Sequence, residues 1–156
     1  MLNKSNLFDI LRKSYSYLSE YNPFNYILPP VRYFLELTYR CNLNCEFCFI
    51  NGSRKKNELS TNEWFNIINQ IPFYSFISLV AGEVLLREDF LKILNKSCLK
   101  TLGKVSIITN GVLLNKDLVK EFIKNNMLLL SVSDDGYKKH HDIIRMKQGL
   151  WDNIFD

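Results

Sequence analysis

The sequence predicts an α/β fold with a parallel sheet, built from about four strand–helix units that follow an N-terminal helix. Short runs of apolar and β-branched residues alternate four times with segments of helical periodicity, and the connections between them are short. Strands that alternate with helices in this way pair in parallel through right-handed crossovers. Because ligands bind at the carboxyl ends of such strands, the residues that follow each strand form the candidate site.

The first thirty residues are expected to form an amphipathic helix and a linker. Apolar side chains recur at helical spacing over residues 5–21, and Pro23 follows that segment. Pro29 and Pro30 lead into a predicted strand over residues 31–38, which is rich in aromatic and β-branched side chains. We therefore divide the chain into an N-terminal segment, 1–30, and a core domain, 31–156.

The remaining elements follow in order along the core domain. Ser60 and Glu63 have the spacing of a capping box, so a helix should begin there and end before Pro72. Strands are predicted over 76–80, 105–109 and 127–133. A second helix should run from about residue 87 to Gly103, and a third should follow an Asn115 cap. The chain from residue 140 onward is expected to be a loop that enters a fourth helix.

Apolar side chains identify the expected inner faces of the second and third helices. For the second helix these side chains are Phe90, Leu91, Leu94 and Leu99, and for the third they are Leu118, Val119, Phe122 and Ile123.

The composition is that of a soluble globular protein, with 47% hydrophobic and 23% charged residues. The net charge of +4 is small and its lysines form no run, so nucleic-acid binding is not predicted. Residues 1–30 contain no secretory h-region, and no apolar stretch approaches the ~20 residues of a membrane span. A cytoplasmic location is therefore expected, where clustered cysteines are metal ligands or redox groups more often than disulfides.

Three cysteines lie in the loop after the first predicted strand, in the sequence ELTYRCNLNCEFCFI over residues 36–50. Their spacing, C-x3-C-x2-C, allows one loop to reach a small metal centre. Structural zinc takes four protein ligands, commonly from two paired motifs, and here no histidine or second cysteine pair lies near. A four-iron cluster on three cysteines would leave one iron open to a ligand. Polar residues between the thiols disfavour simple core packing, while a zinc-stabilised interaction module stays an alternative.

Several motifs together resemble the radical S-adenosylmethionine (SAM) superfamily. The resemblance rests first on Cys41, Cys45 and Cys48, with the aromatic Phe47 directly before the third cysteine. The segment AGEVLL at 81–86 is similar to the family's Gly-Gly-Glu-Pro-Leu-Leu, and TNG at 109–111 is similar to its third-strand ending. SDDG at 133–136, HDIIR at 141–145 and Gly149 resemble the SPASM-type branch, which modifies peptides and proteins. The resemblance covers residues 31–156.

The resemblance implies a 4Fe–4S cluster held by Cys41, Cys45 and Cys48, with SAM on the fourth iron. An external electron donor would then allow SAM to be cleaved to methionine and a 5′-deoxyadenosyl radical, which abstracts hydrogen from a peptide or protein substrate. The cofactor carries this chemistry, so no catalytic side chain is assigned. The implied SAM contacts are Phe47 at the adenine, Gly82 and Glu83 at the amino group, and Ser133 and Arg145 at the carboxylate. Asn110 is a further implied contact, to no assigned part of SAM.

Each implied contact also has a purely structural interpretation. These interpretations are core packing for Phe47, a helix cap for Glu83, a surface charge for Arg145 and a turn for Asn110. Cys98 is expected to be a small buried hydrophobe, and His140 and His141 are expected to be loop residues.

Two features depart from the family pattern. Ala81 replaces the first glycine of the Gly-Gly-Glu segment, and Val84 replaces the proline. If residue 81 has a positive φ, its Cβ costs about 1–2 kcal/mol. The second departure is length. Members of the family share a partial TIM-type barrel of six strand–helix units, whereas this sequence contains about four. We therefore expect a truncated barrel with an exposed apolar edge strand. That edge predicts either a second chain that completes the barrel, or an inactive or partner-dependent fragment that at most binds the cluster.

Overall fold

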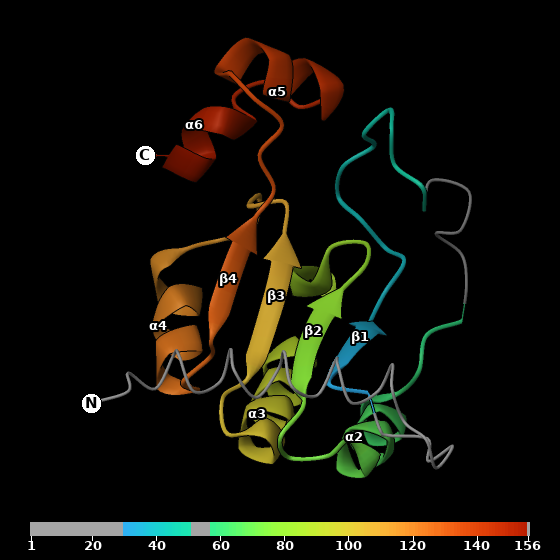
Figure 1. Ribbon diagram of the computed structural model, residues 1–156. Coiled ribbons are helices and arrows are strands. Elements are labelled where there is room, and N and C mark those ends of the chain that lie inside the picture. The colour runs from blue at the N-terminus through green and yellow to red at the C-terminus, as the bar shows by residue number, and fades with distance from the viewer. Residues whose placement is uncertain (1–29, 51–56, 156) are drawn as a thin grey trace, which may run out of the picture. The chain divides into compact units, whose positions relative to one another are not determined.

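Four parallel strands form one sheet in the order β1-β2-β3-β4 (Figure 1). The computed structural model describes residues 30–50 and 57–155. The strands are β1 (Arg32–Glu36), β2 (Phe76–Val80), β3 (Val105–Thr109) and β4 (Leu129–Val132). Because sequence neighbours are also sheet neighbours, each crossover moves the chain in the same direction across the sheet. This is the winding of a (βα) barrel, and it confirms the predicted α/β class.

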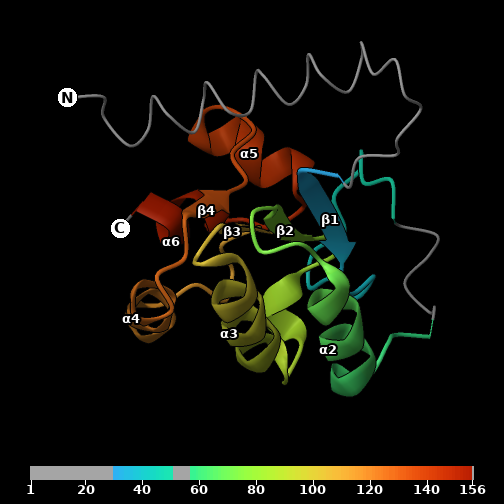
Figure 2. The ribbon, with the colours of Figure 1, turned by 60° about the horizontal axis from the view of Figure 1, so that its bottom comes forward.

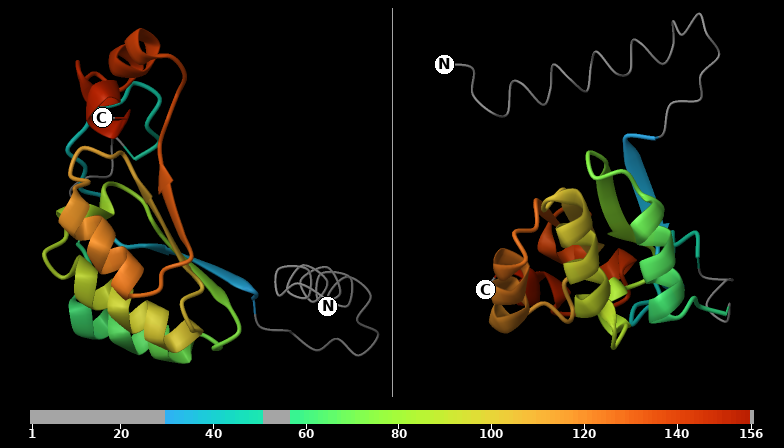
Figure 3. Two further views of the ribbon diagram at one scale, coloured as in Figure 1. Left: turned by 90° about the vertical axis from the view of Figure 1, so that its left-hand side faces the viewer. Right: turned by 90° about the horizontal axis from the view of Figure 1, so that it is seen from below.

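Three helices cover one face of the sheet (Figure 2, Figure 3). They are α2 (Thr61–Gln70), α3 (Phe90–Thr101) and α4 (Lys116–Lys124), and the 3-10 turn η1 (Val84–Leu86) precedes α3. The short helices α5 (Lys138–Ile144) and α6 (Leu150–Phe155) lie beyond the carboxyl ends of the strands (Figure 1). The helices on a single face distinguish this arrangement from a doubly wound sheet.

The main core lies between the sheet and helices α2, α3 and α4. Alternate strand positions point to the same face, so β2 and β3 each contribute two fully buried side chains. These are Ile77, Leu79, Val105 and Ile107, and they belong to one cluster with Ile68, Phe90, Ile93, Leu94 and Phe122 of the helices. The rings of Phe90 and Phe122 meet edge to face with centroids 6.3 Å apart.

The helix ends follow the signals in the sequence. The Ser60 hydroxyl accepts from the Glu63 N–H at 3.4 Å, and the Glu63 carboxylate accepts from the Ser60 N–H at 2.8 Å. This is the predicted capping box. Asn115 caps α4 by accepting from two backbone N–H groups of its first turn. Gly103, with φ +80°, follows α3 and donates to Cys98 O at 2.8 Å.

The predicted inner faces of two helices were wrong in part. Leu99 and Ile123 are 71% and 73% exposed, and Leu91 is also exposed, whereas Ile93 is fully buried. Polar residues take inner positions on α3, because the Ser97 hydroxyl donates to Ile93 O at 2.8 Å and Thr101 bonds in the same way one turn later. Short hydroxyl side chains satisfied by their own helix pack inside without an unpaired polar group.

The carboxyl-terminal part differs from the prediction. Residues expected to form a loop and one helix form two short helices, and His141 lies fully buried in α5 instead of in a loop. The predicted helix over 5–21 lies outside the described residues. None of the helices in residues 30–50 and 57–155 has the length and apolar character to cross a membrane.

Candidate functional site

A cavity of about 280 Å³ lies at the carboxyl ends of the strands. This volume is near the lower end of the range for ligand pockets. The predicted site residues that line it come from four separate segments of the chain. They are Cys41, Cys45, Phe47 and Cys48 after β1, Gly82 after β2, Asn110 after β3, and Ser133 and Arg145 after β4. The structure therefore brings together every predicted site residue except Glu83.

The cavity opens on the sheet face that lies opposite helices α2, α3 and α4. Leu35, Leu79 and Ile107 point toward those helices, so the next residue of each strand points the other way. Those next residues are Glu36, Val80 and Ile108, and all three line the cavity.

Cys41, the first of the three loop cysteines, accepts two hydrogen bonds at its sulfur. Its Sγ accepts from the Leu43 N–H at 3.5 Å and from Asn110 Nδ2 at 3.7 Å. Cysteine sulfur is a ligand of iron–sulfur clusters. N–H···S contacts of this kind are also one means by which proteins tune iron–sulfur clusters. The donor set at this loop therefore fits a cluster.

Cys45 is buried, and Cys48 is half-buried beside it. Burial raises the pKa of the Cys45 thiol, while the nearby charge of Arg145 opposes that rise. Among residues 30–50 and 57–155, no three His, Cys, Asp or Glu side chains are placed to hold one metal ion. In a four-iron cluster each thiolate bonds a different iron, so its donors need not converge on a single point.

Asn110 is both a turn residue and a contact to the cysteine loop. Its Oδ1 accepts from the Val112 N–H at 3.0 Å, which forms the turn after β3. Its Nδ2 donates to Asn42 Oδ1 at 2.8 Å in addition to Cys41 Sγ. The two interpretations of Asn110 are thus compatible, since opposite ends of one amide serve them.

Glu83 lies behind the cavity wall, fully buried. Its carboxylate accepts from the Asn110 N–H at 2.8 Å, the Thr109 hydroxyl at 2.9 Å and the Leu85 N–H at 3.1 Å. Burial raises the pKa of the carboxyl, and these three hydrogen bonds oppose that rise. The carboxylate caps η1 and connects β2 to the end of β3, as the structural interpretation of this residue expected.

The turn after β2 has an unusual backbone. Ala81 has φ +71° and Gly82 has φ +47°, both in the left-handed region that favours glycine. A Cβ at Gly82 would lie 2.7 Å from Thr38 O and still closer to Arg40 O, so only glycine fits there. Ala81 therefore meets the condition under which its Cβ costs about 1–2 kcal/mol.

Arg145 is buried at the cavity, with 7% of its surface exposed, so the surface-charge interpretation is wrong. Its Nε forms an ion pair with the Asp135 carboxylate, and its guanidinium carbon lies 5.8 Å from the centroid of the Phe47 ring. Phe47 is 59% exposed, which also excludes the core interpretation for that ring. Arg145 and Phe47 thus form one charged and aromatic wall of the cavity.

His141 supports this wall from behind, a role that sequence reasoning missed. Its Nδ1 accepts from the Asp135 N–H at 3.2 Å and lies 3.6 Å from the Asp134 carboxylate. The Trp151 ring packs against it edge to face, with the centroids 5.7 Å apart. His141 belongs to the HDIIR motif, and that membership was the only signal in the sequence that it is more than a loop residue.

Comparisons with known proteins relate this chain to a family. A family model described as the radical SAM superfamily matches residues 35–156. The mycofactocin maturase MftC of Mycobacterium ulcerans (strain Agy99) is 31% identical over 104 residues, which cover 65% of this chain and 28% of that protein. The chain spans less than a third of the length of the curated relatives that it matches.

Solved structures of SuiB from Streptococcus suis have a similar fold. The structure bound to S-adenosylmethionine has a TM-score of 0.68 at 18% identity, covering 95% of this chain and 35% of SuiB. The structure bound to the precursor peptide SuiA has a TM-score of 0.68 at 21% identity, covering 95% of this chain and 34% of SuiB. At these identities the likeness establishes the fold alone.

Proposed function

The chain belongs to the radical SAM superfamily, and we propose that it binds a 4Fe–4S cluster through Cys41, Cys45 and Cys48 with S-adenosylmethionine beside it. The observation that carries this proposal is the shared cavity, which is lined by all three thiols and by five further residues with which the family resemblance associates SAM. The hydrogen bonds to Cys41 Sγ provide independent support, since hydrogen bonds to the sulfurs are one means by which proteins tune iron–sulfur clusters.

Bound together, the cluster and SAM supply a reductive cleavage of the sulfonium C–S bond that yields methionine and a 5′-deoxyadenosyl radical for hydrogen abstraction. The protein positions these groups. The exposed ring of Phe47 offers an aromatic face to the adenine, and the backbone at Gly82 lines the same cavity. Ser133 and Arg145 provide a hydroxyl and a guanidinium for the methionine carboxylate, while Asp135 holds Arg145 in place.

We propose a peptide or protein as the substrate. The support is that MftC is named a maturase and that SuiB is known with its precursor peptide. The cavity opens on the sheet face away from α2, α3 and α4, where Glu36, Val80 and Ile108 would meet a bound chain. An external reductant would supply the electron.

Anaerobic reconstitution tests the proposal. The purified chain is loaded with iron and sulfide, reduced in the presence of SAM and assayed for 5′-deoxyadenosine, alongside Cys45→Ala and the control Cys98→Ala. We expect near-stoichiometric iron and sulfide and formation of 5′-deoxyadenosine in the unmodified chain and in the control, and neither in Cys45→Ala. Iron and sulfide without 5′-deoxyadenosine would leave a fragment that only binds the cluster. Bound zinc without sulfide would overturn the proposal.

A further inference from the structure

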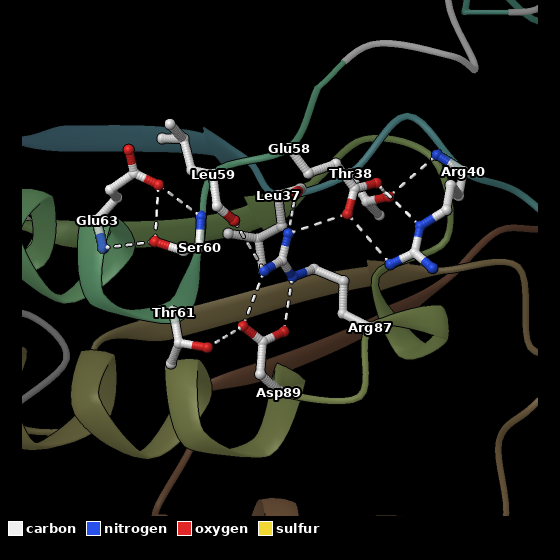
Figure 4. A network of polar contacts seen from close by, with 10 residues as sticks. All are labelled: Leu37, Thr38, Arg40, Glu58, Leu59, Ser60, Thr61, Glu63, Arg87 and Asp89. Atoms are coloured by element: carbon white, nitrogen blue, oxygen red, sulfur yellow. Dashed lines mark hydrogen bonds and ion pairs between the residues drawn. The ribbon is translucent and has the colours of Figure 1, made fainter.

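A network of charged side chains joins the two described parts of the chain between β1 and α2, residues 37–50 and 57–59, which we call the cysteine loop (Figure 4). Arg87 lies at the centre of this network; it precedes α3 and has 7% of its surface exposed. The network lies outside the cavity described above, and none of its side chains lines that cavity. It connects parts of the chain that are far apart in the sequence.

Arg87 binds the backbone at both ends of the loop. One terminal nitrogen donates to Leu37 O at 2.9 Å, where the chain leaves β1, and the other donates to Leu59 O at 3.1 Å, just before α2. Its Nε and one terminal nitrogen bind the two oxygens of Asp89, each at 2.8 Å. A planar guanidinium can hold all of these acceptors at once, whereas a lysine ammonium cannot.

Glu58 extends the network to the start of the loop. Its carboxylate accepts from Arg40 Nε at 3.0 Å and from a terminal nitrogen of Arg40 at 3.1 Å, and it also accepts from the Thr38 hydroxyl. One of its oxygens lies 3.2 Å from Arg87. Burial alone would raise the pKa of Glu58, but these hydrogen bonds and the two arginine charges bring it below its ordinary value.

The position held by Glu58 is directly connected to the proposed cluster site. Arg40 immediately precedes Cys41, and its carbonyl accepts from the Glu83 N–H at 2.8 Å. The same carbonyl packs against Gly82, so tightly that no side chain fits between them. A shift of Arg40 would therefore move Cys41 relative to the turn that lines the cavity.

We infer that Glu58 is a positioning residue for the cysteine loop, acting through Arg40 and Arg87 to fix Cys41 beside the turn after β2. The inference rests on the proposed function, because its consequence for the cluster requires that Cys41 binds one. Groups that hydrogen bond to metal ligands commonly change metal affinity about 10–100-fold when they are removed. Glu58 bonds to Arg40, the residue directly before Cys41, so we expect its removal to have an effect at the lower end of that range.

The variant Glu58→Gln keeps the shape of the side chain and removes its charge. We expect loss of the reconstituted cluster to an iron chelator to become about 10-fold faster or more. Hydrogen exchange of residues 37–50 should rise in the chain without iron, and the electron paramagnetic resonance spectrum of the reduced cluster should change. Arg40→Gln should have a similar effect, and the double variant should add little to either, because both variants disrupt the ion pair between Arg40 and Glu58.

Two controls separate positioning from general stability. Ile93→Val removes one methyl group from the core of α3, and Glu121→Gln removes a surface ion pair with Lys124 on α4. Neither variant should change hydrogen exchange in residues 37–50 or the electron paramagnetic resonance spectrum of the reduced cluster, even if it lowers the unfolding temperature. The contrary result is that Glu58→Gln behaves as Ile93→Val should, with a lower unfolding temperature but unchanged hydrogen exchange in residues 37–50 and an unchanged electron paramagnetic resonance spectrum. In that case the inference is wrong and the network is only structural.

The design also separates the inference from the proposed function. If the unmodified chain takes up no cluster, the proposed function fails, and the exchange comparison without iron still decides whether Glu58 fixes the loop. Should Glu58→Gln not fold, Arg40→Gln gives the same test, since the Arg40 side chain is 52% exposed and its removal leaves the bonds of Arg87 to Asp89 and the backbone in place.

Discussion

Replacing Ala81 by glycine should stabilise the folded chain. Ala81 has φ +71°, where a Cβ costs about 1–2 kcal/mol. Glycine removes that cost but gives the unfolded chain more freedom, which offsets about 0.4–1 kcal/mol. The net gain lies between about 0 and 1.6 kcal/mol. Its centre, about 0.8 kcal/mol, raises the unfolding temperature of a chain of 156 residues by roughly 2–3 °C.

Calorimetry of Ala81→Gly and the unmodified chain, both without iron and at equal concentration, measures this difference. Leu99→Gly is the matched control, since Leu99 is exposed within α3, where glycine costs about 1 kcal/mol relative to a good helix former. Leu102→Gly provides a second comparison, because Leu102 ends α3 with φ +55° and is exposed. We expect Leu99→Gly to lower the unfolding temperature, and Leu102→Gly to raise it.

The sign of each change in unfolding temperature should follow the backbone conformation of the substituted residue. If Ala81→Gly lowers the unfolding temperature as Leu99→Gly does, the strain assigned to residue 81 is absent. The argument that this position is costly for any residue but glycine would then be refuted.

Three further predictions concern buried and charged groups. Glu83→Gln should destabilise the fold by about 1–3 kcal/mol in urea denaturation, because the NH2 group of glutamine cannot accept the hydrogen bond of a donor such as the Asn110 N–H. An unchanged urea midpoint of unfolding would contradict the hydrogen bonding described. Cys98→Ala should leave iron content unchanged and cost about 1 kcal/mol, since this thiol is buried in the core and its pKa is raised to about 11 by burial; lost iron would implicate it as a ligand. The pKa values of Glu58 and Asp89 lie below their ordinary values, so their ion pairs stabilise the fold above about pH 4. That contribution is lost as the pH falls through the lowered values, and a free energy of unfolding that does not fall on acidification would refute it.

Two of the four strands could be predicted from the sequence to the residue, and the first and fourth were predicted too long. The runs at 76–80 and 105–109 are short, apolar and bounded by Pro72, Gly103 and the motifs that follow them, so both strands were predicted with their observed bounds. The fourth strand is shorter than predicted, because only Leu129–Val132 pairs with β3. Apolar periodicity failed for α3, where hydroxyl side chains bonded to the helix backbone occupy inner positions.

The candidate site was predictable as a set of residues, since motifs that follow parallel strands meet at one edge of the sheet. The hydrogen-bond partners were not predictable. Glu83 lies one residue from cavity-lining Gly82, yet its carboxylate turns to the backbone of β3 and η1. Likewise, nothing in the spacing of Arg40, Glu58 and Arg87 indicates that they meet, because such pairs form only once β1, α2 and α3 are packed.

The central claim is that three thiols of one loop hold a cluster with an iron left for SAM. Electron paramagnetic resonance of the reconstituted, reduced chain tests it most directly, with spectra recorded before and after SAM is added. We predict the signal of one 4Fe–4S cluster per chain and a change in that signal when SAM binds. A cluster whose spectrum is unaffected by SAM at saturating concentration would contradict the claim.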